Sequence, residues 1–297
     1  MKITYSKLTE KELDTFIQMR IRQLREEGAK EKIDLAPALK DYYERHMADG
    51  TFVSWLALDG EKIIGTSGMS FVEKPPYFGC PNGRIGLLSS MFTDPAYRRR
   101  GIAKELLRHA FEDIGMTKVW CGYYEGNTKS KRVQEKVGFR YQWRSEGVDV
   151  PLMHEKRTGH VSSITKDQWE WDRLYAAAAA VRNERRISDY VTCGEVSAAI
   201  LSGSGKIYTG VCIDTCSTLG ICAERNAIFN MITNGEQEIK KVIAILPDGS
   251  SGAPCGACRE LMVQLMPEKY KGIEIMMDYR QEKIITLGEL TPEWWIG

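Results

Sequence analysis

Three cysteines in two separate segments of the sequence limit how the C-terminal half of this chain can fold. Cys222 is followed two residues later by Glu224, and Cys255 and Cys258 form a Pro-Cys-x-x-Cys segment. No histidine follows His160, so a metal site built within the C-terminal half must use cysteine thiolates. If these cysteines bind one ion, the fold has to bring the two short segments together.

Three thiolates at this spacing can hold one Zn²⁺ and leave the fourth tetrahedral position for a water molecule, whose pKa the metal lowers. Glu224 lies beside the ligands without being needed as one, so it is the expected proton shuttle. Arg225 and Arg259 directly follow Glu224 and Cys258. We expect both arginines to offset the negative charge of the three thiolates from just outside the ligand shell.

A structural zinc site is the competing interpretation, because structural sites have four protein ligands. Cys212 or Cys216 could supply the fourth. Clustered cysteines would pair as disulfides in a secreted protein, but the N-terminus shows no apolar signal region. No apolar stretch approaches the roughly 20 residues of a membrane span. We therefore expect a soluble cytoplasmic protein that binds no membrane.

The C-terminal half alternates predicted strands and helices. Thr165 and Gln168 form a capping box that opens a helix through the alanine run 176–180. Further helices are predicted to begin at Cys222 and Cys255, and strands at 196–201, 207–213, 241–246 and 273–277. Strands separated by helices imply crossover connections, which is typical of an α/β architecture.

The N-terminal half contains a basic, glycine-containing loop between a predicted strand, 86–93, and a predicted helix, 102–114. Its sequence is Arg98-Arg99-Arg100-Gly101-Ile102-Ala103. The two small residues leave room at the helix N-terminus, where backbone N–H groups and the helix dipole can hold a pyrophosphate. The arginines add positive charge.

The rest of this half mixes both element types. A helix is predicted over 8–25, strands over 52–58, 63–71 and 118–124, and a helix over 129–136. Residues 145–163 show no clear periodicity, so we place the domain boundary there. The expected domains are 1–157 and 158–297, an α/β protein of two domains.

Residues 166–297 resemble the small cytidine deaminase family, which includes blasticidin-S deaminase. The resemblance rests on three segments, 222–228 (Cys-Ala-Glu-Arg-Asn-Ala-Ile), 254–260 (Pro-Cys-Gly-Ala-Cys-Arg-Glu) and 289–292 (Glu-Leu-Thr-Pro). It implies a three-layer α/β/α sandwich, and a homotetramer in which neighbouring subunits complete each active site. It also implies the pattern of zinc-dependent nucleobase deamination, with a three-cysteine ligand set.

One segment and one further position depart from that family. The family reads ribose with Asn-x-Glu-Asn, where this chain has Cys212-Ile-Asp214-Thr215. Ser197 stands where the nucleoside enzymes usually have glycine. Asp214 is the remaining candidate for substrate contact. Cytidine, deoxycytidine, a nucleoside antibiotic and other aminopyrimidines all stay open as substrates.

Residues 1–157 resemble the GNAT acetyltransferases, whose signature Arg/Gln-x-x-Gly-x-Gly/Ala matches residues 98–103. A second block, 127–130 and 135–139, is similar to the family's C-terminal motif. The resemblance implies an α+β fold that binds acetyl-CoA, with backbone contacts from Met91 and Thr93 to pantetheine. It also implies that Asn127 and Ser130 lie near the cofactor.

The acetyltransferase resemblance names no catalytic residue in this chain. Many family members have a tyrosine as general acid where this chain has Gln134, and the strand 85–93 carries no carboxylate. The sequence thus predicts a bifunctional enzyme that deaminates a cytosine-type nucleoside and acetylates an amine. A single active deaminase with a vestigial partner domain, and a nucleotide-sensing scaffold with structural zinc, are the alternatives. A net charge of +1 gives no reason to expect a nucleic-acid partner.

Overall fold

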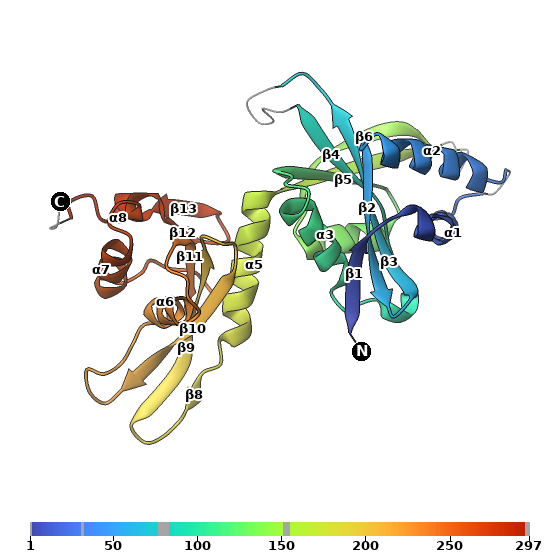
Figure 1. Ribbon diagram of the computed structural model, residues 1–297. Coiled ribbons are helices and arrows are strands. Elements are labelled where there is room, and N and C mark those ends of the chain that lie inside the picture. Colours follow the sequence, from blue (N-terminus) through green and yellow to red (C-terminus); the bar gives the residue numbers. More distant parts are fainter. Residues whose placement is uncertain (1, 31–32, 77–82, 151–154, 295–297) are drawn as a thin grey trace. The chain divides into compact units, whose positions relative to one another are not determined.

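The computed structural model describes residues 2–30, 33–76, 83–150 and 155–294. It divides the chain into two compact units, Met1–Trp169 and Glu170–Gly297 (Figure 1), which are described one at a time. Among these residues, no helix is both long and apolar enough to cross a membrane.

The first unit is built on a seven-stranded sheet of order β1-β2-β3-β4-β5-β7-β6. Its strands are β1 (Ile3–Lys7), β2 (Phe52–Asp59), β3 (Lys62–Glu73), β4 (Arg84–Thr93), β5 (Lys118–Tyr124), β6 (Arg140–Val150) and β7 (Glu155–Thr165). All neighbours are antiparallel except β4 and β5. These two pair only where Gly86 and Leu87 meet Val119 and Trp120, so the strands diverge beyond that point.

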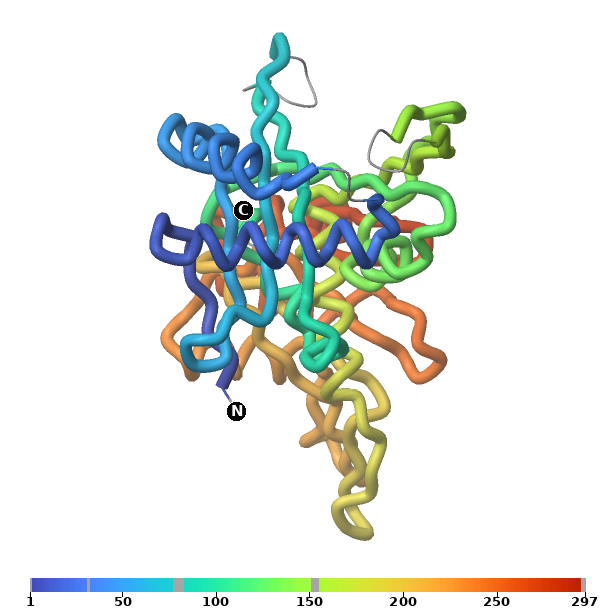
Figure 2. Tube along the Cα trace, turned by 90° about the vertical axis from the view of Figure 1, so that its right-hand side faces the viewer, coloured from blue at the N-terminus to red at the C-terminus, as the bar shows by residue number. Residues whose placement is uncertain are grey.

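Two pairs of helices cover this sheet. The helices α1 (Leu13–Glu26) and α2 (Ala36–Ala48) pack on one face and α3 (Ile102–Glu112) and α4 (Thr128–Val137) on the other. Phe52 and Leu56 of β2 join the α1–α2 core, whereas Val53 joins the α3 core, as the period of two in a strand requires. Figure 2 shows α1 running across the strands. Two short 3₁₀ helices, Glu10–Glu12 and Pro95–Tyr97, precede α1 and α3.

The strands β6 and β7 occupy the region in which the sequence shows no periodicity. β6 lies at the edge of the sheet and is exposed along almost its whole length, so its sequence carries no apolar alternation. β7 lies between β5 and β6 and therefore belongs to the first sheet. The boundary predicted between residues 157 and 158 falls inside β7, and the units divide after Trp169 instead.

The second unit has a sheet of order β10-β9-β11-β12-β13, with β8 added beside β9. Its strands are β8 (Arg185–Arg186), β9 (Val191–Ser202), β10 (Ile207–Thr215), β11 (Ile239–Ile245), β12 (Glu274–Asp278) and β13 (Lys283–Thr286). Only β11 and β12 are parallel, joined by a helical crossover. The helices are α5 (Lys166–Val181), α6 (Ala223–Thr233), α7 (Gly256–Leu265), the 3₁₀ helix Tyr270–Gly272 and α8 (Leu287–Leu290).

Helices cover both faces of this second sheet. Trp171 and Leu174 of α5 pack against Ala199 on one face. Ile228 of α6 and Met262 of α7 pack with sheet residues on the other face. This arrangement is the three-layer α/β/α sandwich, so the predicted fold class is confirmed.

The helix α6 lies unusually close to β10. A Cβ atom added at Gly210 would lie 2.3 Å from the Ala227 nitrogen and 2.6 Å from the Ala223 oxygen. Asn226 also donates from Nδ2 to the Val211 carbonyl at 2.9 Å. These contacts with β10 therefore set the distance of α6 from the sheet, and the first turn of α6 carries the candidate site.

Candidate functional site

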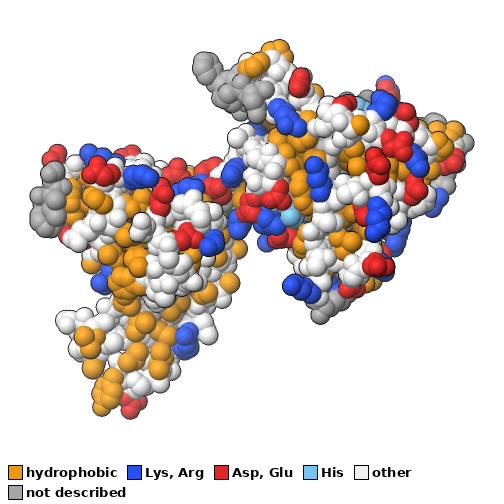
Figure 3. Space-filling model, in the orientation of Figure 1, with side chains coloured by type: hydrophobic (Ala, Val, Ile, Leu, Met, Phe, Trp, Pro, Cys, Tyr) orange, Lys and Arg blue, Asp and Glu red, His pale blue; other side chains and the backbone are white. Residues whose placement is uncertain are grey.

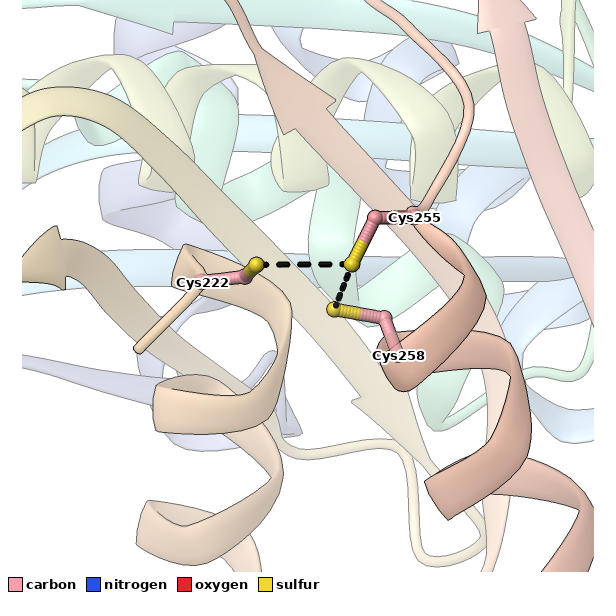
Figure 4. A group of neighbouring side chains, drawn as sticks. All are labelled: Cys222, Cys255 and Cys258. Atoms are coloured by element: carbon pink, nitrogen blue, oxygen red, sulfur yellow. Dashed lines mark hydrogen bonds between the residues drawn. The ribbon is translucent and has the colours of Figure 1, made fainter. Parts of the chain in front are cut away.

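The three predicted ligands meet between the N-termini of α6 and α7. Cys222 is the N-cap residue of α6, Cys255 is the N-cap residue of α7, and Cys258 lies in the first turn of α7. The Cys255 sulfur lies 3.4 Å from that of Cys222 and 3.5 Å from that of Cys258 (Figure 4), and all three lie within 4.8 Å of one another. Sulfurs on one tetrahedral zinc would be about 3.8 Å apart, so the cluster fits the ion.

Neither cysteine considered as a fourth ligand joins this cluster. Among the residues that the structure describes, only Cys222, Cys255 and Cys258 form a potential metal-binding group. The Cys212 sulfur instead accepts a hydrogen bond from the Val196 backbone nitrogen at 3.3 Å, and Cys216 is exposed. Within the described chain, the ligand set leaves one tetrahedral position open, as in catalytic zinc sites.

Glu224 lies in the first turn of α6 and is only 5% exposed. Burial raises the pKa of this carboxyl, while a contact with Cys258 and the charge of Arg225 partly oppose the shift. A buried carboxyl next to metal ligands with a raised pKa suits a group that takes up and returns protons.

The two arginines predicted beside the thiolates have different surroundings. Arg225 Nη2 lies 3.9 Å from the Cys222 sulfur and donates to it. Arg259 donates instead to two carbonyls, those of Pro254 at 2.9 Å and Leu290 at 3.1 Å. In these contacts Arg225 offsets thiolate charge, whereas Arg259 fastens the start of α7 to the end of α8.

The three thiols also differ in acidity. Burial would raise the pKa of Cys255, but the Cys258 N–H and contacts with neighbouring thiols outweigh it and lower that pKa. Burial, followed by the Cys255 thiol, raises the pKa of Cys222. Burial also raises the pKa of Cys258, so Cys255 at its helix N-terminus is the thiol that ionises most readily.

Asp214 lies near the end of β10. The preceding residue, Ile213, forms a two-bond bridge with Ile221, with N–O distances of 2.9 and 2.8 Å. Ile221 leads directly into Cys222, so the bridge brings the end of β10 beside the metal-ligand segment. Ser197 is fully buried on β9 and, by strand alternation, shares the α5-facing side with Ala199. It therefore faces away from α6 and α7.

In the first unit, the glycine-containing loop leads into α3. Gly101 is the N-cap residue with φ +80°, and Arg99 also has a positive φ, +67°. Arg98 donates to Glu26 at 2.8 Å and to the Thr93 carbonyl at 3.0 Å, which holds this side chain against α1. The N–H groups of the first turn of α3 remain the natural donors for an anion.

The second predicted cofactor segment opens α4. Asn127 caps the helix by accepting from the Ser130 backbone nitrogen at 3.0 Å. The buried Gln134 donates from Nε2 to the Ser130 hydroxyl at 3.2 Å and to the Gly122 carbonyl of β5 at 3.3 Å. Gln134, at the position of the family's tyrosine, is therefore held by hydrogen bonds to both α4 and β5.

Two features of the sites were not predicted from the sequence. Gly210 interrupts an apolar strand, a signal of close backbone approach that could have been used. The Met91 carbonyl accepts a hydrogen bond from Gln23 of α1 at 3.3 Å, a contact across 68 residues that no local pattern announces.

The chain matches known proteins in both units. Residues 15–139 match the family model "Acetyltransferase (GNAT) family", and residues 170–271 match "Cytidine and deoxycytidylate deaminase zinc-binding region". A cytidine deaminase of Halalkalibacterium halodurans is 33% identical over 101 residues, which cover 33% of this chain and 74% of that protein. A blasticidin-S deaminase of Bacillus cereus is 30% identical over 89 residues, covering 27% of this chain and 64% of that protein.

A solved structure of a predicted acetyltransferase with acetyl-CoA from Clostridium acetobutylicum is similar at 26% identity and a TM-score of 0.44. That similarity covers 51% of this chain and 97% of the other. The chain spans about half the length of several other curated relatives. For a cytidine deaminase of Sporosarcina psychrophila, the match covers 52% of that protein. The chain belongs to the cytidine deaminase family, and its N-terminal unit is an acetyltransferase domain of the GNAT family.

Proposed function

We propose that this chain is a bifunctional enzyme that hydrolytically deaminates a cytosine-type nucleoside and transfers an acetyl group from acetyl-CoA to an amine. The observation that carries the first activity is the buried Glu224 carboxyl in contact with Cys258, beside a three-thiol cluster. A purely structural zinc site has no use for a buried, unliganded carboxyl at that place.

In this proposal, Cys222, Cys255 and Cys258 hold one zinc ion, which when bound makes a water molecule acidic and nucleophilic. Glu224 takes the proton of the attacking water and returns it to the ring nitrogen. It then takes the proton of the newly added hydroxyl group and passes it to the amine, which leaves as ammonia. Burial keeps this carboxyl out of bulk water, and Arg225 offsets the thiolate charge at Cys222.

We further propose that the site binds ribose weakly and favours a modified nucleoside as substrate. Blasticidin-like antibiotics are the leading candidate substrates. Cys212 cannot donate the amide hydrogen bond of an asparagine, and its sulfur already accepts from Val196. Asp214 is one methylene shorter than the family's glutamate. A site without its hydroxyl-reading groups discriminates less among sugars.

The test is kcat/KM for cytidine beside a panel of nucleoside antibiotics, in wild type and Asp214→Ala. We expect blasticidin S to be processed better than cytidine. A cytidine kcat/KM of about 10⁵ M⁻¹s⁻¹ or more, with the antibiotics inert, would place the enzyme in pyrimidine salvage instead.

The acetyltransferase proposal rests on the loop 98–103 at the N-terminus of α3 and on the diverging strands β4 and β5. Acetyl-CoA should bind with its pyrophosphate on the N–H groups of Gly101, Ile102 and Ala103. Calorimetry should detect binding to wild type and weaker binding to Arg98→Glu/Arg100→Glu. No binding to wild type would favour a vestigial domain.

A homo-oligomer formed through the second unit is the proposed assembly. Figure 3 shows apolar side chains on the surface of this unit. Among the exposed large apolar residues are Phe229 (44%) and Ile232 (43%) on α6 and Tyr190 (70%) before β9. Apolar surface of this kind marks interaction sites. Light scattering should give a tetramer for wild type and smaller species for Phe229→Lys/Ile232→Lys. A monomeric wild type would refute the assembly.

A further inference from the structure

The strands β4 and β5 open into a V at the predicted acetyl-CoA site. Their pairing ends at Leu87 and Trp120, and β4 then bends at Ser90, which has a φ of +51°. Met91 follows on β4, and Cys121 lies on β5 across the opening. If the proposed acetyl transfer is correct, the thioester lies in this V.

The end of α1 reaches into the same region. One nitrogen, Gln23 Nε2, donates to the Met91 carbonyl at 3.3 Å and to the Glu27 carboxylate at 3.1 Å. An amide nitrogen has two protons, so both are committed to these partners. Glu27 is half-buried and is the C-cap residue of α1. Gln23 therefore ties the Glu27 carboxylate to the backbone of β4 at the bend.

The charge of Glu27 also affects Cys121 on β5, the other strand of the V. Burial, and after it the negative charge of Glu27, raises the pKa of Cys121 to about 12, although a Gly122 contact opposes the shift. Glu27 is thus linked to β4 by a hydrogen bond relayed through Gln23 and to β5 by its charge. No carboxylate lies on β4 itself, where the sequence offered no base.

We propose that Glu27 accepts the proton of the acceptor's ammonium group, and that the acceptor is an amine that is protonated at neutral pH. This inference rests on the proposed acetyl transfer. The neighbouring Glu26 is committed elsewhere, since it binds Arg98 at 2.8 Å. A half-buried carboxylate both attracts a cationic amine and can take its proton.

The ammonium gives one proton to Glu27, and the neutral nitrogen attacks the thioester carbonyl. A C–N bond forms and the C–S bond breaks, and the nitrogen's second proton passes to the departing CoA thiolate. Glu27 then returns its proton to water. The products are an amide, CoA and one proton.

The test uses the full chain, acetyl-CoA and three amines that are protonated at pH 7: n-butylamine, 1,4-diaminobutane and lysine amide. CoA release is measured from pH 6 to 10 in wild type, Glu27→Gln and the matched control Glu10→Gln, an exposed carboxylate near the start of α1. Calorimetry with acetyl-CoA accompanies each variant. We expect Glu27→Gln to lose about 10²- to 10⁴-fold in rate at pH 7 with unchanged acetyl-CoA affinity. Its rate should rise toward wild type at high pH, where the free amine is abundant.

Three outcomes separate the possibilities. A Glu27→Gln rate within threefold of wild type, or an equal loss at every pH, overturns the role of Glu27. Wild type that binds acetyl-CoA but acetylates none of the three amines overturns the inferred acceptor class while leaving the cofactor site intact. Wild type that does not bind acetyl-CoA overturns the proposed acetyl transfer and this inference with it.

Discussion

Gly210→Ala tests how the sheet positions the deaminase site. The added methyl group would lie 2.3 Å from the Ala227 nitrogen, whereas ordinary contacts begin at 3.4 Å. The helix α6 must therefore move away from β10 by about 1 Å, because the opposing atoms are backbone and cannot rotate away. Overpacking of this kind costs about 1–3 kcal/mol. For a unit of this size the loss corresponds to roughly 3–10 °C in melting temperature.

The same movement should displace Glu224, which lies in the first turn of α6. A displacement of about 1 Å at a reacting group can lower the rate about 10²-fold. Differential scanning calorimetry and ammonia release are the assays. Gly272→Ala is the matched control, since a Cβ there has no heavy atom within 4 Å and the φ is not positive. If Gly210→Ala melted within 1 °C of wild type with unchanged activity, the proposed support of α6 by β10 would be wrong.

Three further predictions concern the second unit. Hydrogen bonds from Ser202, Ser204, Lys206 and Tyr208 lower the pKa of Glu236 to about 2, from an ordinary value of 4.5. The ionised carboxylate therefore stabilises the fold fully above pH 4.5, and this stabilisation is lost as the pH falls toward 2. Glu236→Gln should melt below wild type at pH 7, with the difference vanishing near pH 2; a constant difference would refute this. Lys241 is 6% exposed and forms ion pairs with Glu170 and Glu274. Lys241→Met should therefore lower the free energy of unfolding, measured in urea, by on the order of 3 kcal/mol. An unchanged free energy of unfolding would contradict a stabilising role for these ion pairs. Cys258→Ser should reduce bound zinc measured by mass spectrometry to well below one ion per chain; full occupancy would exclude Cys258 as a ligand.

Local signals account for much of what the sequence could predict. The capping box at Thr165 and Gln168 forms with both hydrogen bonds at 3.1 Å. Gly60 and Glu61 form the two-residue turn between β2 and β3, with Gly60 at φ +62°. Cys222 and Cys255 both become N-cap residues of helices, as predicted from the sequence.

Features that depend on distant contacts could not be predicted in the same way. β6 is exposed along most of its length, and therefore gives no alternating pattern. Arg259 follows a ligand just as Arg225 does, yet α8 offers it the Leu290 carbonyl and turns it away from the thiols. The Gln23–Met91 contact joins α1 to β4 through tertiary packing alone. Spacing in the sequence identifies candidate residues. Their hydrogen-bond partners, however, lie in elements that are distant in the sequence and meet them only in the folded protein.

The proton-shuttle role of Glu224 is decided by comparing Glu224→Gln with wild type in zinc content and ammonia release, using cytidine and blasticidin S. We expect one zinc per chain in both proteins and an unchanged fold. Deamination should fall by about 10²- to 10⁴-fold in the variant, because the substitution removes the proton shuttle but no zinc ligand. Near wild-type turnover in Glu224→Gln, or loss of its zinc, would contradict the proposed chemistry of the site.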